Sequence, residues 1–394
     1  MKKTLKAGIV GSGFASSFHY SAIRSVIGVD IEIVGVYSPT EEHRVRFAEQ
    51  RGIHPIHSLE ELIGRSDVLH ICTPVSTHES ILTLALERDT FPVVEKPLTG
   101  FCGDGTENFR GDLFPKGEAL EAVLGRLTRI LKAEKSSKAK ILYAENWVYA
   151  PAIQKEREII EKSGAQILWM KGEQSHSGSH AVESGFWKFA GGGVAMNNAV
   201  HPLSAALYLK RKEGAARTGK PIRPRAVSAR THQITRLPGY EDKGHLRSAY
   251  HDTEDLAQLH VEFEDGTIAD IFASAIVLGG INNRLEIVAN NHRTLCNINP
   301  NNTMQTFSPR EEYLQDVYVV EKTGTKQGWS NPAPDETFAT GYPQEMESFY
   351  RTAAYGEPLE SDSSLAADAL CTLYSGYLSA ERGGTKAGIE TVRS

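Results

Sequence analysis

Short apolar runs alternate with amphipathic stretches along the first 145 residues. The runs at 5–10, 31–37, 68–72 and 91–94 have the length and apolar character of buried strands. Helical periodicity lies between them, near 15–27, 41–51, 59–63 and 78–88. Strict alternation of strand and helix predicts right-handed crossovers and a doubly wound parallel sheet, an α/β architecture. Residues 141–144 are its expected last strand.

Composition narrows the class of protein. The chain has 394 residues, enough for two domains, and its 40% hydrophobic and 23% charged residues are ordinary for a globular protein. A net charge of −6 argues against a nucleic-acid partner. No apolar stretch approaches 18 residues, and the N-terminus enters a strand without a signal-peptide pattern, so we expect no membrane partner and a cytoplasmic location. The cysteines are widely spaced and predict reduced thiols: Cys72, Cys102, Cys296 and Cys371.

A glycine-rich turn follows the first strand and opens a helix. Gly11 permits the tight turn, and Gly13 lets the backbone approach a pyrophosphate held at the helix N-terminus. The motif alone is weak, but its place between strand and helix is the context that a dinucleotide site requires. We therefore predict a Rossmann domain in which Gly11, Gly13, Phe14 and Ala15 contact the cofactor.

The end of the second strand bears on the choice of cofactor. An acid usually binds the adenosine ribose there, whereas this chain has Ser38. Loss of the carboxylate removes repulsion toward a 2′-phosphate, and His43 or Arg44 could supply positive charge, although such residues more often belong to a solvated helix face. Pro39 stands where an arginine would be best placed. We expect NAD, with Ser38 and Arg44 as contacts, and NADP is left open.

Two further motifs lie at the carboxyl ends of predicted strands. Thr73 and Pro74 leave the strand at 68–72 and lead to His78, either as a capped turn or as cofactor contacts. Glu95 and Lys96 close the strand at 91–94. A lysine there is poorly placed for packing, but this edge of an open parallel sheet is where ligands bind. We predict that all five residues lie at the cofactor.

In this order, the glycine turn, Thr73-Pro74 with His78, and Glu95-Lys96-Pro97 resemble the Gfo/Idh/MocA oxidoreductases. The segments 191–201, 256–274 and 342–349 resemble the family's glycine-rich helix start, its long sheet hairpin and its terminal helix. The resemblance implies a Rossmann domain over 1–145 and an α+β domain over 146–394 with an open, mostly antiparallel sheet. It also implies a homodimer or homotetramer that uses this sheet.

The resemblance places Lys96 and His201 as catalytic residues beside the nicotinamide and a sugar or polyol. The chemistry is sensible, because hydride leaves a carbinol carbon only as its hydroxyl proton is removed. Histidine titrates near pH 7, and an ammonium group stabilises a developing oxyanion. Glu145 and Asn146, at the junction after the last strand, are predicted substrate or nicotinamide contacts.

Asn197 departs from the family, which commonly has aspartate four residues before the histidine. Asparagine can hydrogen-bond a substrate hydroxyl but cannot accept its proton, so His201 or another group must be the base. The glycine-rich stretch 99–116 is a second departure. Loops of this length are often functional, and it either walls the active site or is a surface excursion.

A polar run follows the predicted strand at 166–170. Lys171, His176 and His180 are expected to bind hydroxyls or an anionic substituent of the substrate. No third ligand supports a metal on the two histidines, so we predict none. Trp187 either stacks on a sugar face or packs in the core.

Three functions follow. The first is NAD(P)-dependent oxidation of a secondary hydroxyl of a sugar, sugar acid or polyol. The second is redox-neutral, NAD-dependent glycoside hydrolysis, in which C3 is oxidised, the aglycone is eliminated, water adds and the sugar is reduced again. Its substrate would include anionic sugars such as sulfoquinovosides. The third is a cofactor-binding regulator without catalysis.

Overall fold

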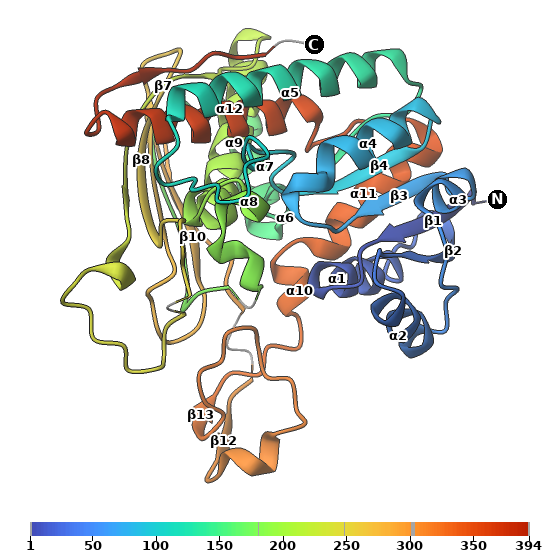
Figure 1. Ribbon diagram of the computed structural model, residues 1–394. Coiled ribbons are helices and arrows are strands. Elements are labelled where there is room, and N and C mark those ends of the chain that lie inside the picture. The colour runs from blue at the N-terminus through green and yellow to red at the C-terminus, as the bar shows by residue number, and fades with distance from the viewer. Residues whose placement is uncertain (1, 180, 248, 301–303, 393–394) are drawn as a thin grey trace.

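The computed structural model describes residues 2–179, 181–247, 249–300 and 304–392. Its N-terminal sheet has five strands in the order β2-β1-β3-β4-β5, and all its pairs are parallel (Figure 1). The strands are β1 (Thr4–Val10), β2 (Asp30–Tyr37), β3 (Val68–Ile71), β4 (Phe91–Glu95) and β5 (Leu142–Ala144). The predicted doubly wound parallel sheet is confirmed.

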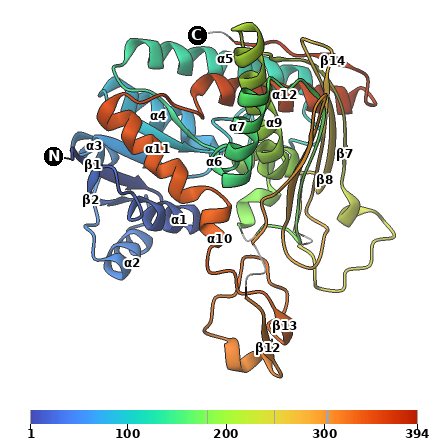
Figure 2. The same ribbon diagram turned by 180° about the vertical axis from the view of Figure 1, so that it is seen from behind.

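Helices cover this sheet and connect its strands. They are α1 (Phe14–Ile23), α2 (Glu41–Arg51), α3 (Leu59–Gly64), α4 (His78–Glu87) and α5 (Lys116–Ser136). Helix α1 ends at Ile23 rather than near residue 27, because the Ser25 hydroxyl and backbone amide both donate to the Ala22 carbonyl and close the last turn. From the far end of the chain, α11 (Tyr342–Tyr355) packs against α1 (Figure 2).

The second sheet has seven strands in the order β11-β10-β6-β9-β8-β7-β14 and is mixed, since only β6 and β9 pair in parallel. Helices α9 (Val200–Thr218) and α12 (Ser363–Glu381) pack on it, and α7 (Pro151–Ser163) packs on α9. The predicted open, mostly antiparallel sheet is thus confirmed. The strands are β6 (Ile167–Ser175), β7 (Pro224–His232), β8 (Leu256–Phe263), β9 (Ile268–Ser274), β10 (Asn282–Ala289), β11 (Arg293–Asn297) and β14 (Ala387–Gly388).

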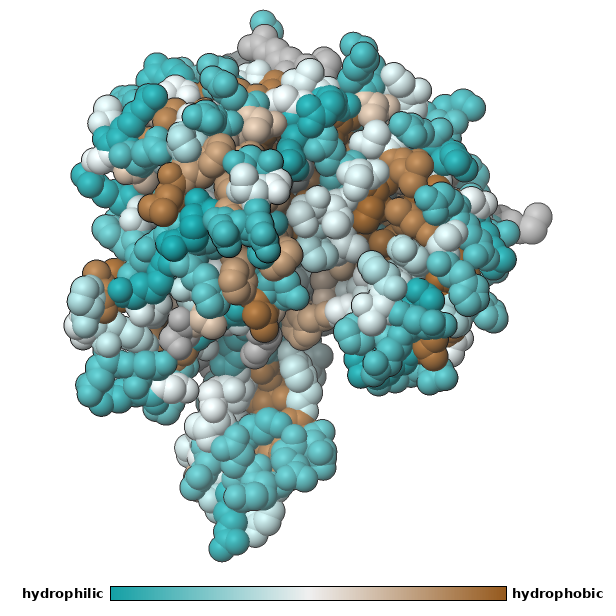
Figure 3. All heavy atoms as spheres, in the orientation of Figure 1, coloured by the Kyte–Doolittle hydropathy of each residue, from teal (hydrophilic) through white to brown (hydrophobic). Residues whose placement is uncertain are grey.

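A lobe projects from the body between β11 and α11 (Figures 1 and 2). We call its described part, residues 304–341, the lobe; it contains β12 (Thr306–Ser308), β13 (Gly328–Ser330) and α10 (Glu336–Ala339). Its tip is mainly hydrophilic, and hydrophobic side chains gather toward its attachment (Figure 3). Over the described ranges, no helix combines the length and apolar character needed to cross a membrane.

The loop 99–116 joins the two halves of the molecule. The Gly111 amide donates to Asp252, and the Trp187 indole donates to the Phe101 carbonyl at 2.9 Å. The Phe101 amide donates to the Tyr374 hydroxyl, which donates in turn to the Gly191 carbonyl. Both ends of the loop therefore pack on the second half of the chain, and residues 104–108 between them are exposed. None of its described residues lines the cavity of the candidate active site.

Candidate active site

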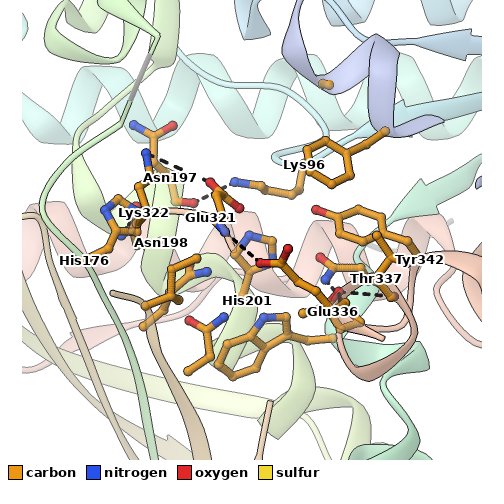
Figure 4. A pocket seen from close by; sticks show the side chains of 18 of the residues that line it. Lys96, His176, Asn197, Asn198, His201, Glu321, Lys322, Glu336, Thr337 and Tyr342 are labelled. Carbon is orange, nitrogen blue, oxygen red and sulfur yellow. Dashed lines mark hydrogen bonds and ion pairs between the residues drawn. The ribbon is translucent and has the colours of Figure 1, made fainter. Parts of the chain in front are cut away.

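A cavity of about 250 Å³ lies between the carboxyl ends of the parallel strands, the second sheet and the base of the lobe (Figure 4). Segments far apart in the sequence contribute to it. Its lining includes Phe14, Ala15, Phe18, Glu95, Lys96, Asn146, Trp147, Gln174, His176, Asn197, Asn198, His201, Asn283, Glu321, Lys322, Glu336, Thr337, Thr340 and Tyr342.

Lys96 enters the cavity directly after β4. Its Nζ donates to the backbone carbonyl of Asn197 at 2.7 Å, so the ammonium is tied to the chain that leads into α9. Burial lowers the pKa of Lys96, and the charges of Glu95, Glu145 and Glu321 oppose that change. The group is therefore a cation held among carboxylates, suited to stabilise a developing oxyanion.

His201 lies in the first turn of α9, after the π-helical segment Ala195–Ala199. Its Nδ1 lies 2.6 Å from Oε1 of Glu145. Because a carboxylate only accepts, Nδ1 carries a proton, and Nε2 is the basic nitrogen. Burial lowers the pKa of His201, although the charge of Glu145 opposes this. The imidazole is thus neutral at pH 7 and fit to accept a proton.

Glu145 is fully buried at the N-cap of α6 (Asn146–Tyr149), and its Oε1 also accepts from the Trp147 amide. Its orientation is fixed by this cap and by His201. Its neighbour Asn146 lines the cavity and donates to the Thr340 carbonyl at 2.7 Å. The two residues therefore have different roles, Glu145 behind the histidine and Asn146 at the cavity wall.

Glu95 is held from behind by a buried chain of hydrogen bonds. Its Oε1 lies 2.9 Å from Nε2 of His19, and the two Nδ1 atoms of His19 and His70 are 2.9 Å apart. His70 Nε2 in turn contacts the Tyr350 hydroxyl. Burial works to raise the pKa of Glu95, but His19, Lys96 and His201 outweigh it and lower the pKa. Glu95 therefore stays ionised beside Lys96.

The glycine turn fits a dinucleotide. Gly11 has φ of +107°, and a Cβ there would lie 2.3 Å from the Cys72 carbonyl oxygen. Gly13 is the N-cap of α1, and a Cβ on it would meet nothing within 4 Å, which leaves space for a phosphate at the helix N-terminus. Phe14 and Ala15 continue from this turn to the cavity wall, so the site for a dinucleotide leads toward Lys96.

Ser38 and Arg44 support NAD rather than NADP. The Arg44 guanidinium is buried and donates to the Ser38 carbonyl at 2.7 Å, so it turns toward the backbone. The Ser38 hydroxyl contacts Ser12 of the glycine turn at 3.1 Å. Arg44 therefore holds the end of β2, and it is not directed outward toward a 2′-phosphate.

His78 links two loops at the sheet edge. One ring nitrogen lies 2.9 Å from the Thr73 carbonyl and the other 3.0 Å from the Pro97 carbonyl, and the side chain is buried. It therefore supports the turn after Lys96 from behind the cavity. The Thr73 hydroxyl accepts a hydrogen bond from the Thr77 hydroxyl at 2.7 Å. Pro74 precedes the short helical turn Val75–Thr77. Contact of these three residues with the cofactor stays a prediction.

The predicted substrate residues separate into two groups. His176, Asn197 and His201 line the cavity. Lys171 does not, because the alternation along β6 turns it to the open face of the second sheet. Trp187 does not either; it is buried, packs against Tyr377 with the two rings tilted, and lies under the Lys116 ammonium. His180 lies outside the described residues.

Sequence reasoning missed the residues that the lobe contributes. Glu321, Lys322, Glu336 and Thr337 line the cavity, as does Tyr342 of α11 (Figure 4). Lys322 has φ of +60°, and its ammonium lies 4.0 Å from Glu321. The lobe has no periodicity that would place these residues near Lys96. A non-glycine residue with positive φ is often functional, but it is not visible in a sequence.

Comparisons with known proteins agree with this geometry. The family model described as "Oxidoreductase family, NAD-binding Rossmann fold" matches residues 5–109, and the GFO/IDH/MocA C-terminal domain model matches 165–293. A UDP-N-acetylglucosamine 3-dehydrogenase of Acidithiobacillus ferrooxidans is 26% identical over 98 residues, 24% of this chain and 29% of the relative. A glucose-6-phosphate 3-dehydrogenase of Bacillus subtilis is 28% identical over 93 residues, 24% of this chain and 26% of the relative.

Solved structures share the fold over nearly the whole chain. GenD2 from gentamicin A biosynthesis, in complex with NAD, has a TM-score of 0.79 at 20% identity, with 99% of this chain and 98% of that one covered. A putative myo-inositol dehydrogenase from Sinorhizobium meliloti has a TM-score of 0.70 at 16% identity, with 98% and 100% covered. At these identities the likeness establishes the fold. The NAD-binding description of the family model confirms the predicted cofactor.

Proposed function

The chain belongs to the GFO/IDH/MocA oxidoreductase family, and from that premise we propose that it oxidises one secondary hydroxyl of a sugar, sugar acid or polyol. One observation carries the proposal. Lys96 and the His201–Glu145 pair meet in a single cavity whose wall continues into the glycine turn of the Rossmann domain. A base, an oxyanion stabiliser and a hydride acceptor are the three groups that alcohol oxidation requires.

Bound NAD supplies the hydride acceptor. Nε2 of His201 takes the hydroxyl proton as the hydride leaves the same carbinol carbon, and the hydroxyl becomes a carbonyl. Glu145 stabilises the imidazolium that forms, because its carboxylate already accepts from Nδ1. The Lys96 ammonium donates to the oxygen while negative charge develops there. Its bond to the Asn197 carbonyl aims Nζ at one place.

The polar lining supports a substrate with several hydroxyls. Gln174, Asn198 and Asn283 provide amide groups beside the histidines, and hydroxyls need many paired donors and acceptors. The two curated relatives are named as 3-dehydrogenases of hexose derivatives. We propose a hexose or cyclitol as the substrate class. We also propose that the open face of the second sheet joins two or four copies, as the resemblance implies.

Purified protein with NAD tests the proposal on a panel of myo-inositol, glucose, glucose 6-phosphate and UDP-N-acetylglucosamine, with NADH absorbance as the readout. One panel member should give NADH in wild type and none in Lys96→Met. NADH from no member would contradict the proposal. Aryl glycosides in the same plate test the hydrolase, because aglycone release without net NADH is its signature. Glycoside hydrolysis is the second candidate function because the Glu321 carboxyl lies in the cavity. Elimination of the aglycone needs a second group that transfers a proton, and Glu321 could be that group.

A further inference from the structure

The charge at the cavity does not come only from the Rossmann domain and α9. Glu321 and Lys322 enter from the lobe, which lies beyond the segment matched by the C-terminal family model. Figure 4 shows the Glu321 carboxylate near both Lys96 and Lys322. The family's usual carboxylate is absent at residue 197, where Lys96 contacts only the backbone carbonyl. A carboxylate from another part of the chain thus lies close enough to act on the charge of Lys96.

Hydrogen bonds within the lobe hold the backbone at Glu321. The Glu321 amide donates to Oε1 of Glu336 at 3.0 Å, and Oε2 of Glu336 accepts from the Tyr318 hydroxyl at 2.7 Å. Lys322 adopts positive φ, and its side chain is 4% exposed. Among the described residues, its one ion-pair partner is Glu321 at 4.0 Å. A separation of this size leaves the carboxylate oxygens able to accept another hydrogen bond.

We propose that Glu321 is a substrate-binding residue that accepts a hydrogen bond from a substrate hydroxyl beside Lys96, in place of the acid missing at Asn197. The inference rests on the proposed function and extends it, because it assigns the lobe a part in choosing the substrate. A carboxylate accepts from two neighbouring hydroxyls at once, whereas an amide offers one oxygen. The site therefore favours a substrate with adjacent hydroxyl groups.

The charges around Glu321 predict how the activity of the enzyme depends on pH. Burial raises its pKa, Glu336 adds to that rise, and Lys322 and Lys96 oppose it; the phenols of Tyr318 and Tyr342 also face it. The ionised Glu321 carboxylate is a stronger hydrogen-bond acceptor than the neutral acid, and His201 must be neutral. Two groups therefore have to lose a proton before the enzyme is fully active. At low pH, log kcat/KM should rise with a slope that approaches two.

The test compares wild type with Glu321→Gln on the panel sugar that wild type oxidises. We expect kcat/KM to fall about ten- to a hundredfold, the range of a hydrogen bond to a charged group, with NAD affinity unchanged. The acid slope should drop from two toward one, and Glu321→Asp should restore part of the activity. Glu312→Gln, an exposed carboxylate on the same lobe, is the matched control and should match wild type.

A double variant separates binding from structure. Glu321→Gln leaves the Lys322 ammonium without its partner, whereas Glu321→Gln with Lys322→Met removes both charges. If Glu321 serves only to neutralise Lys322, the double variant will regain wild-type kcat/KM, and the inference is overturned. If Glu321 binds substrate, the double variant stays impaired. Inactivity of wild type on every panel sugar would instead overturn the proposed function, and this inference with it.

Discussion

Nδ1 of His201 lies 2.6 Å from Oε1 of the fully buried Glu145. The two residues are 56 positions apart, and each is fixed by its own element, Glu145 by the cap of α6 and His201 by the first turn of α9. The contact assigns one tautomer to the imidazole. It also places a negative charge where an imidazolium forms during oxidation.

Glu145→Gln should therefore lower kcat about a hundredfold or more, because the glutamine amide can donate to Nδ1 and move the ring proton to Nε2. Steady-state NADH formation on the active panel sugar measures the loss. NAD affinity and the melting temperature should stay close to wild type, which excludes a folding defect. A variant with unchanged kcat would remove Glu145 from the mechanism.

The pH profile of wild-type kcat/KM should be bell-shaped. On the acid side, His201 acts as a neutral base with a pKa lowered by burial, so its protonation, together with that of Glu321, makes activity fall as pH drops below 6.5. Lys96 acts as a cation with a pKa lowered by burial, so activity falls again as pH rises through a value below 10.5. In Lys96→Arg the alkaline limb should disappear, since arginine stays charged. An alkaline limb that persists would assign it to another group.

Two glycines of one turn should respond differently to the same substitution. Gly11→Ala places a Cβ against the Cys72 carbonyl, at a positive φ that side chains avoid. We therefore expect the free energy of unfolding to fall by about 1 to 3 kcal/mol. Gly13→Ala meets no protein atom, so its stability should be near wild type while NAD binding weakens. Thermal melts and NAD titrations of both variants separate the two effects. Equal NAD affinity in Gly13→Ala and wild type would argue against a pyrophosphate there.

The hydroxyl of Tyr374 joins the loop 99–116 to the glycine-rich start of the helix that carries His201. It accepts from the Phe101 amide at 2.6 Å and donates to the Gly191 carbonyl at 2.7 Å, and the residue is fully buried. Tyr374→Phe leaves the Phe101 amide and the Gly191 carbonyl unpaired. The free energy of unfolding measured in urea should therefore fall by about 2 to 4 kcal/mol. Tyr355→Phe, at a partly exposed tyrosine that also makes backbone bonds, should cost less than about 1 kcal/mol.

The sequence predicts the parts of the site that follow from parallel strands. Gly11 and Lys96 lie at the same edge of the sheet because each follows the carboxyl end of a parallel strand, β1 and β4. Lys171 could have been placed on the open face by its alternation with Gly172 and Gln174, but the polar character of the run outweighed that signal. The contribution of Glu321 was beyond prediction, because it depends on the path of an irregular lobe.

The imidazole of His19 is fully buried between Glu95 and His70, and this arrangement predicts a pH-dependent stability. Burial alone would lower the pKa of His19, but Cys72 and Glu95 outweigh it and raise the pKa well above 6.5. The folded chain therefore binds this proton more tightly than the unfolded chain does. The stabilisation is complete below pH 6.5 and is lost as pH rises through the raised pKa.

Urea unfolding of wild type and of His19→Gln at several pH values measures this stabilisation as the difference between their free energies of unfolding. The difference should be largest below pH 6.5 and should shrink as pH increases above that value, because the proton that favours the folded state is then released. His57→Gln, at an exposed histidine, should show no such trend. A His19→Gln difference that is constant with pH would mean that His19 is neutral in the folded chain. Glu95 would then be held by a neutral hydrogen bond, and the ion pair behind Lys96 would not exist.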